Sequence, residues 1–419
     1  MPSAAPVASL TLVVLLSCIA FATPAASLRL IGEQNTEAGT EDKRPLPDIK
    51  LFDSFSEIGQ EQRDAWLNIW STQAWALLQT LQAGRDKTPL HILMVGDSTM
   101  RKQMAFLCDF LEPGVQHDFH GPEVTESSCF NRELRLRVSH LWSPCCDPSE
   151  LRHWSQRLAD DSDGSGAAKR AAQVEPEVVY HNCGLHLMHL GAFRPFECLP
   201  RPYAEVLGGF QQAVAEVYPH ALQVLMTTHS ICESLFTGGY REAVDQAHWK
   251  PQVLTDACVK DLSQRLWRSK GSNADATRAA PEGVTRALGG LCRSGMMIDD
   301  TAARQRAAVL AAVEAARRRP SAAGGGGGGA SDGGRGTSPS RIDVVDAYAL
   351  TWQQCWASDK MDGRHYPFLV PLEAQQFLGV VSRWLLPQAA AGGGGGGGGE
   401  GGTLGGGGMA TGGGGASGK

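Results

Sequence analysis

Three short blocks of the sequence carry residue types that together can perform nucleophilic acyl chemistry. They are Gly96-Asp97-Ser98, Asn182-Cys183-Gly184 and Asp362-Gly363-Arg364-His365. A serine hydroxyl becomes a nucleophile when a histidine removes its proton, while a carboxylate orients that histidine and stabilises the imidazolium. The first and third blocks supply these three groups. The amide of Asn182 supplies a donor for the oxyanion of a tetrahedral intermediate.

Each block also has a purely structural interpretation. Asp and Ser are ordinary N-cap residues, so a strand followed by Gly-Asp-Ser and a helix is typical of a capped helix. Asn before Cys-Gly and the tetrapeptide Asp-Gly-Arg-His are both common in turns. What favours a site is that the three blocks occur together, each after a predicted strand.

The hydrophobic pattern predicts the strands that position these blocks. Apolar runs over residues 90–95, 178–181, 222–226 and 342–348 predict buried strands, and alternation over 134–141 predicts a half-buried one. Segments with helical spacing lie between or around them, at residues 52–81, 100–111, 203–218, 299–319 and 371–386. Strands alternating with helices favour an α/β fold with a mainly parallel sheet. In such a sheet the carboxyl ends of the strands share one edge, and ligands bind there. Ser98, Asn182, Asp362 and His365 then converge at that edge.

Composition divides the 419-residue chain into parts. We expect a signal peptide or signal anchor over residues 1–26, a flexible stem over 27–50, one domain over 51–387 and a disordered Gly-rich tail over 388–419. Within the domain, residues 160–172 resemble a surface loop, and residues 268–340 resemble a low-complexity insertion. The helix expected at 299–319 has a basic face that favours contact with solvent.

The N-terminal segment and the cysteines both favour the secretory pathway. Apolar residues 10–22 precede a patch of small residues, but residues 1–9 contain no Lys or Arg, so an uncleaved signal anchor remains the alternative. Ten of the 11 cysteines follow this segment, an even number that predicts several disulfides whose pairing the sequence does not reveal. We therefore expect a protein that is secreted or lies in the ER or Golgi lumen.

The charge pattern bears on possible partners. The formal net charge is −6, and no basic stripe is interleaved with aromatic residues, which argues against nucleic acid as a partner. A membrane is expected as a partner only if the N-terminal segment remains as an anchor.

The three blocks, with Arg101 and Gln103 after the first and His186 after the second, resemble the motif set of the PC-esterase branch of the SGNH (GDSL-like) hydrolases. This branch includes the trichome-birefringence-like polysaccharide O-acetyltransferases, the neurexophilin-like PC-esterases and the sialic-acid O-acetyltransferase luminal domain. The resemblance covers residues 88–387. It implies a flavodoxin-like three-layer α/β/α sandwich, with Ser98 as nucleophile, His365 as base, Asp362 as its orienting carboxylate and Asn182 as an oxyanion donor. It implies no cofactor and no metal.

The same resemblance implies a carbohydrate or other acylated substrate. The block at Asp362 lacks the Cys and Trp of the plant enzymes, so xylan and pectin are not implied, and Gly121 is the candidate for the family's oxyanion glycine. Esterase and transferase activities remain open, because both pass through an acyl-serine and differ in whether water or a sugar hydroxyl attacks it.

Two other interpretations remain at this point. His181, His186 and His189 with Cys183 have a spacing that permits a zinc site, although a luminal thiol favours a disulfide. A catalytically inactive glycan-binding or scaffold protein that keeps the fold is the second alternative.

Overall fold

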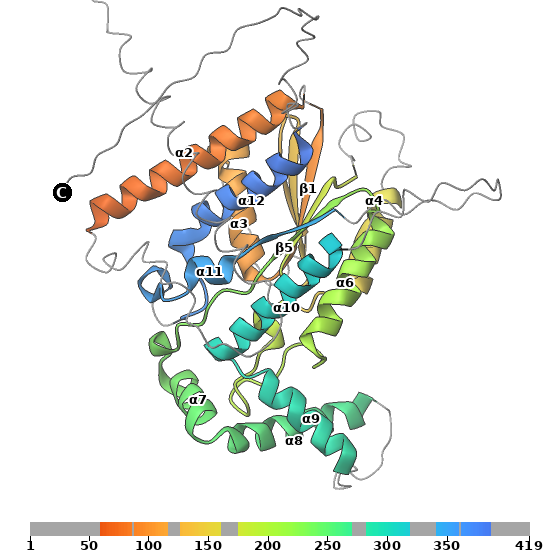
Figure 1. Cartoon of the computed structure of the whole chain (residues 1–419), viewed down its shortest axis with the longest axis vertical. Helices are drawn as coiled ribbons and strands as arrows, with labels where there is room; N and C mark the ends of the chain where they lie inside the picture. Colours follow the sequence, from red (N-terminus) through yellow and green to blue (C-terminus); the bar gives the residue numbers. More distant parts are fainter. Residues whose placement is uncertain are drawn as a thin grey trace, which may run out of the picture. The chain divides into compact units, whose positions relative to one another are not determined.

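A six-stranded sheet lies at the centre of the protein (Figure 1). The computed structural model describes residues 59–85, 88–115, 126–160, 175–269, 282–318, 341–359 and 362–386. The strands are β1 (Leu90–Gly96), β2 (Glu126–Asn131), β3 (Leu136–Trp142), β4 (Val178–His181), β5 (Leu222–Met226) and β6 (Ile342–Val345). The expected signal segment, stem and tail, Gly121 and most of the 160–172 loop lie outside the described residues.

The sheet is mixed, with the order β2-β3-β1-β4-β5-β6. Its four pairings from β3 to β6 are parallel, and only β2 with β3 is antiparallel. The antiparallel pair is a hairpin, and its turn is held by a hydrogen bond of 2.9 Å from Leu134 N to Asn131 Oδ1. Two strands joined by so short a turn must run antiparallel, whereas the others need helical crossovers. The sheet is thus parallel as expected except at this edge, where β2 was not predicted.

Helices cover both faces of the sheet. On one face, α2 (Gln60–Gly84), α3 (Ser98–Leu111) and α12 (Val370–Leu385) pack against the strands and bury a large apolar cluster. On the other, α4 (Pro148–Asp160), α6 (Tyr203–Val217) and α10 (Asp299–Arg318) do the same. β1 has all seven residues buried because it lies between the two layers. This α/β arrangement is compatible with a three-layer sandwich.

The region expected to be an insertion is in part integral to the fold. Val309 and Val313 of α10 are buried against Leu225 of β5 and Ile342 of β6. α10 is therefore the crossover helix between these two strands, and the Ala- and Arg-rich composition conceals a buried stripe. Its basic side is not only solvated, since Arg306 forms a bidentate ion pair with Asp346.

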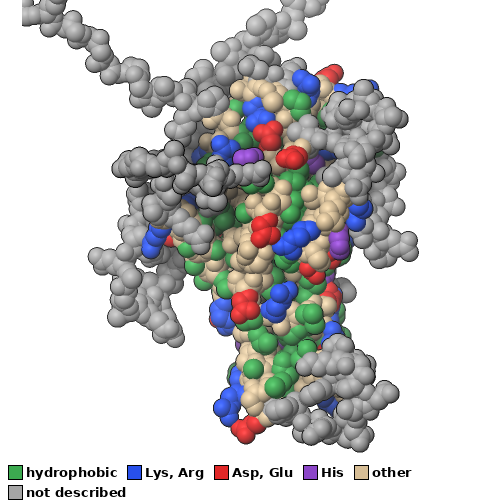
Figure 2. All heavy atoms as spheres, turned by 90° about the vertical axis from the view of Figure 1, so that its right-hand side faces the viewer, with side chains coloured by type: hydrophobic (Ala, Val, Ile, Leu, Met, Phe, Trp, Pro, Cys, Tyr) green, Lys and Arg blue, Asp and Glu red, His purple; other side chains and the backbone are tan. Residues whose placement is uncertain are grey.

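A second group of helices lies beyond the sandwich (Figure 1). It consists of α7 (Gly238–Trp249), α8 (Pro251–Ser269) and α9 (Glu282–Ser294), and the Cys258–Cys292 disulfide joins α8 to α9. A short helix, α11 (Ala347–Thr351), follows β6. On the face drawn in Figure 2, acidic and basic side chains are interspersed with apolar ones.

The ten cysteines form five disulfides, as their even number predicted. They are Cys108–Cys129, Cys145–Cys198, Cys146–Cys183, Cys232–Cys355 and Cys258–Cys292. So many disulfides indicate maturation in an oxidising, secreted or luminal environment. Among the described residues, none of the helices has the length and apolar character that a membrane span requires.

Candidate active site

Ser98 is the first residue of α3, directly after the C-terminal end of β1. The Asp97 side chain caps the helix by accepting a hydrogen bond of 2.8 Å from Thr99 N. Gly96 allows a close approach of two chain segments, because a Cβ there would lie only 2.8 Å from the carbonyl oxygen of Asn182. The strand, turn and helix expected around Ser98 are present, and its hydroxyl is half-buried at the edge where the parallel strands end.

His365 and Asp362 meet Ser98 at this edge. The Ser98 Oγ lies 2.6 Å from His365 Nε2, and His365 Nδ1 lies 2.9 Å from Asp362 Oδ2. With a proton on Nδ1 donated to the carboxylate, Nε2 is free to accept the hydroxyl proton of the serine. The side chains of His365 and Asp362 are 14% and 25% exposed, so the relay is shielded but not wholly buried. The structure thus brings the three predicted residues together.

The surroundings of Asp362 keep it ionised. Burial alone would raise its pKa, but the hydrogen bond and charge of His365, together with the charge of Arg364, lower the pKa well below its usual value. Arg364 adds hydrogen bonds to the carboxylate from its guanidinium group and from its backbone N. Asp362 therefore remains a carboxylate that can orient His365 and stabilise the imidazolium.

Gly363 shapes the loop that carries both residues. Its φ is +64°, in the left-handed region, and a Cβ would lie 2.4 Å from the carbonyl oxygen of Cys232. Its own carbonyl accepts a hydrogen bond of 2.7 Å from Cys232 N. Only glycine satisfies both conditions without strain, which explains why glycine separates Asp362 from Arg364.

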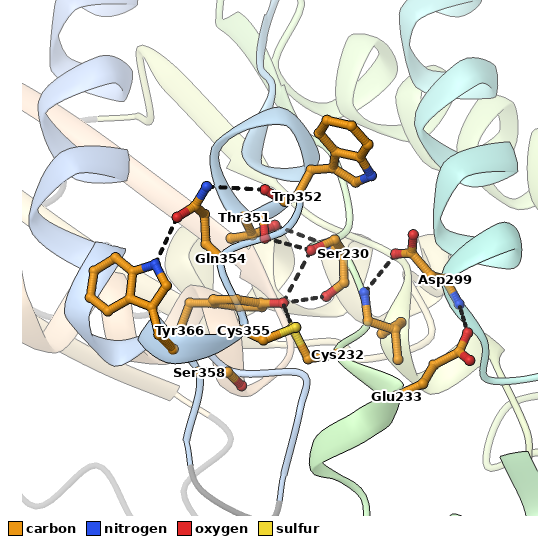
Figure 3. The surroundings of a disulfide bond; sticks show 12 residues. Ser230, Cys232, Glu233, Asp299, Thr351, Trp352, Gln354, Cys355, Ser358 and Tyr366 are labelled. Atoms are coloured by element: carbon orange, nitrogen blue, oxygen red, sulfur yellow. Dashed lines mark hydrogen bonds between the residues drawn. A yellow bond between two sulfur atoms is a disulfide. The ribbon is translucent and has the colours of Figure 1, made fainter. Parts of the chain in front are cut away.

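A disulfide and a buried tyrosine anchor this loop (Figure 3). Cys232, in the loop after β5, is bonded to Cys355, a few residues before Asp362 in the chain. The Tyr366 hydroxyl lies beside the disulfide, 3.0 Å from Cys232 Sγ, and donates a hydrogen bond of 3.0 Å to the carbonyl oxygen of Ser230. Tyr366, directly after His365, and Gly363, two residues before His365, are therefore both fixed to the loop after β5.

A buried ion pair contacts this loop, and it was not predicted from the sequence. His229 Nε2 lies 2.7 Å from Glu373 Oε1, and both side chains are almost wholly buried, with 2% and 0% of their surface exposed. The other ring nitrogen faces the carbonyl oxygen of Arg364 at 3.2 Å, and Gln103 donates to the second oxygen of Glu373 at 2.7 Å. The position of His229 after β5 was the only sequence signal, since Glu373 lies on the last helix.

The carboxylate of Glu373 favours the charged form of His229. Burial alone would lower the pKa of His229, but the charge of Glu373 and its hydrogen bond outweigh burial and raise the pKa. Both ring nitrogens then donate, one to Glu373 and one to the carbonyl next to His365. The pair thus links α12 to the loop that carries His365.

His140, near the end of β3, has the opposite environment. Its side chain is buried, and neither ring nitrogen has a hydrogen-bond partner among the residues that the structure describes. Burial, followed by the positive charge of Arg101, lowers the pKa of His140 to about 4. It is therefore neutral at ordinary pH.

Asn182 lies where it was expected, directly after β4, and is buried. Its amide nitrogen is 3.4 Å from the carbonyl oxygen of Thr227, and its Oδ1 has no partner within the described part of the chain. Its role as an oxyanion donor stays a prediction.

The residues of the alternative zinc site do not gather at one point among the described residues. Cys183 is bonded to Cys146, with His181 close to the disulfide. The Nδ1 atom of His186 contacts the Glu197 carboxylate. His189 lies elsewhere, with its ring nitrogens hydrogen-bonded to Cys292 O and Gly191 N. Comparison of the chain with models of known protein families and with curated proteins gave no match.

Proposed function

We propose that the protein is a serine-dependent acyl esterase or O-acyltransferase that acts on O-acyl groups of carbohydrates in the secretory pathway. The observation that carries the proposal is the relay of Ser98, His365 and Asp362, with contacts of 2.6 and 2.9 Å. Buried His-carboxylate pairs also occur for structural reasons. Here, however, the relay ends on a half-buried serine at the N-terminus of a helix.

The chemistry follows from these positions. Ser98 Oγ attacks the acyl carbonyl carbon as His365 Nε2 takes the hydroxyl proton, and the imidazolium is stabilised by Asp362. The tetrahedral intermediate collapses when the leaving sugar oxygen takes this proton from His365, which leaves an acyl-Ser98. Water or an acceptor hydroxyl then loses its proton to His365 and attacks the acyl group, and Ser98 regains its proton as the intermediate breaks down.

The helix N-terminus favours the negative charge that develops in this reaction. The first N–H groups of a helix have no partners within it and point outward from the positive end of the helix dipole. The backbone N–H of Ser98 belongs to this group and is well placed as an oxyanion donor. We expect the Asn182 amide to turn from Thr227 and provide a second donor when substrate is bound.

The topology supports the finer assignment of the fold. Counted along the chain, the five parallel strands have the order 2-1-3-4-5, which is the flavodoxin-like order. Ligands in such sheets bind at the carboxyl ends of the strands, where the relay lies. Together with the three sequence blocks, this order favours an SGNH-type sandwich of the PC-esterase branch.

Hydrolysis of 4-nitrophenyl acetate by the purified luminal domain tests the proposal. The wild type should release nitrophenol, and Ser98→Ala should lose at least about 10³-fold in kcat, as expected when a nucleophile is removed. Ser127→Ala is a matched control, because this serine is also half-buried and its hydroxyl donates to Met104 Sδ rather than to a histidine. Equal activity of Ser98→Ala and wild type would refute the assignment, and an inactive wild type would favour the binding or scaffold role.

Mass spectrometry of O-acetylated oligosaccharides then separates the two activities. Loss of acetyl groups to water identifies an esterase. Their appearance on a second, unacetylated oligosaccharide identifies a transferase.

A further inference from the structure

Arg101 lies close to the nucleophile and has no role in the relay. It follows Ser98 by three residues in α3, so the two side chains are neighbours on the helix surface. The guanidinium carbon is 4.9 Å from the centre of the Trp142 ring. Trp142 ends β3 and pairs in register with Gly96, directly before the turn that carries Ser98. Arg101 and Trp142 therefore form one side of the candidate active site, on the β3 side of Ser98.

Two other cations around the relay are paired with carboxylates. Lys102 forms an ion pair of 2.9 Å with Asp359, and Arg364 pairs with Asp362. Arg101 has no carboxylate partner among the residues that the structure describes. Of these three cations near Ser98 or His365, Arg101 is therefore the one whose guanidinium forms no ion pair within the described residues.

Two acidic side chains on this side of the site, Asp97 and Glu197, form no ion pair with Arg101 in the described part of the chain. The charge of Asp97 opposes that of Arg101 at His140, and its second carboxylate oxygen is buried without a hydrogen-bond partner among the described residues. Asp97 directs one oxygen to Thr99 N as the helix cap. Glu197 is shared by His186 and Arg194, both of which contact its carboxylate. His186 in turn packs its ring edge-on against Trp142 at 5.8 Å. His186 and Arg194 are thus the side chains that contact the Glu197 carboxylate, and Arg101 is not among them.

The contact with Trp142 leaves the binding capacity of Arg101 intact. A guanidinium over an aromatic ring uses its flat face, while its N–H donors lie along its edge in a fork that matches a carboxylate or sulfate. Arg101 is half-buried, so the charge is partly removed from solvent and gains more from an anion than a fully exposed charge would. Trp142 also fixes the side chain in place, which lowers the entropic cost of binding.

We infer that Arg101 binds an anionic group of the acylated substrate, a carboxylate or a sulfate, next to the ester that Ser98 attacks. The inference rests on the proposed function and names the class of its substrate: acidic rather than neutral O-acylated sugars. Arg101 is then a specificity residue. It acts on the substrate's anion, whereas the Ser98 N–H and helix N-terminus act on the oxyanion.

Kinetics with paired substrates test this inference. Wild type, Arg101→Gln and Arg101→Lys are compared on O-acetylated oligosaccharides that carry glucuronate, a sulfated hexose or only neutral hexose. Charged hydrogen bonds of this kind correspond to roughly 10- to 100-fold in affinity. We expect Arg101→Gln to lower kcat/KM on one or both acidic substrates, mainly through KM, by about that factor more than it lowers kcat/KM on the neutral substrate. Arg101→Lys should lose less, because it keeps the charge without the fork.

The pattern of losses distinguishes the possible roles. Loss on the glucuronate substrate alone identifies a carboxylate ligand, and loss on the sulfated one alone identifies sulfate. An equal loss on acidic and neutral substrates would overturn the inference, because a residue that stabilises the oxyanion or the fold affects every ester alike. Arg241→Gln is the control, since Arg241 forms an exposed pair with Asp245 on α7.

Binding without turnover separates this inference from the proposed function. Calorimetry with Ser98→Ala and the same oligosaccharides should show tighter binding of an acidic ligand than of the neutral one, and Ser98→Ala/Arg101→Gln should lose the difference. If the wild type hydrolyses and transfers nothing but this preference is present, the proposed function fails and the anion site stands. If turnover is present but the affinity for no oligosaccharide depends on Arg101, the proposed function stands and the anion site is refuted.

Discussion

Replacement of Glu373 by Gln tests the buried ion pair beneath the active-site loop. The change keeps the size of the side chain and removes its charge. His229 then has no counter-ion, although it is only 2% exposed and sits 2.7 Å from the substituted group. It must either stay charged without a partner or lose the proton that it donates to the carbonyl of Arg364 at 3.2 Å.

The expected loss of stability is large. Breaking a buried pair by removing one partner costs about 3–5 kcal/mol in the free energy of unfolding. With a shift in Tm of about 2–4 °C per kcal/mol for domains of 150–250 residues, Tm should fall by roughly 6–20 °C. We expect a loss of stability toward the lower end of this range, because the amide oxygen of the new glutamine still accepts the hydrogen bond from Gln103.

A double-mutant cycle measures the pair itself. Unfolding in guanidinium chloride is followed for wild type, Glu373→Gln, His229→Gln and the double variant. The double variant should be more stable than the sum of the single losses predicts, by about 1–3 kcal/mol, because the first change already removes the contact. Glu314→Gln is the control: its pair with Arg318 is exposed, and such pairs contribute about 0.3–0.5 kcal/mol.

Activity gives a second measurement on variants that still fold. Because His229 supports the carbonyl next to His365, Glu373→Gln should also lower kcat for an aryl ester below the unfolding temperature. The reasoning is refuted if Glu373→Gln costs no more stability than Glu314→Gln, or if the losses in the cycle are additive.

Two further predictions concern the loop and the acid stability of the fold. Gly363→Ala should reduce kcat by at least about tenfold, because the φ of +64° at this position and the Cys232 oxygen 2.4 Å from the new Cβ force the loop to shift. The control is Gly379→Ala in α12, where the new Cβ meets nothing within 4 Å and the unfolding free energy should rise by about 1 kcal/mol. Equal kinetics of the two variants would contradict the role given to the loop. The pKa of His140 is lowered from 6.5 to about 4 in the folded protein. Between these pH values the unfolded chain binds a proton at this histidine that the folded protein does not bind. The free energy of unfolding therefore falls as the pH drops through this window, by roughly 3 kcal/mol at pH 4. His140→Gln should flatten the dependence of Tm on pH between 6.5 and 4, and parallel profiles for variant and wild type would show that the burial of His140 has no such effect.

The fully buried strands could be predicted from the sequence because their signal is local. Residues 178–181 and 222–226 are β4 and β5 with the expected bounds, since a short apolar run between polar residues has few alternatives. β2 was missed because Glu126–Asn131 is mostly polar and owes its strand to the hairpin with β3. The helical spacing of α10 was recognised, but its place on the sheet depends on β5 and β6, which no local pattern reveals.

The same distinction applies to the site. Ser98, Asp362 and His365 could be found because each belongs to a short block of recognisable chemistry, and the strand ends brought them to one edge. The pair of His229 and Glu373 could not, because 144 residues separate its members and neither belongs to a motif. The disulfide partners likewise depend on spatial proximity, since ten cysteines allow many pairings.

The order of these blocks along the chain also sets when the relay can exist. The ribosome makes Ser98 first, and His365 follows it by 267 residues. At about 5–20 residues per second, this interval lasts roughly 13–53 seconds. During that time the serine has an ordinary hydroxyl with no base beside it. The contact between Ser98 and His365 therefore cannot form until the chain beyond β6 has been made, after both cysteines of the Cys232–Cys355 bond.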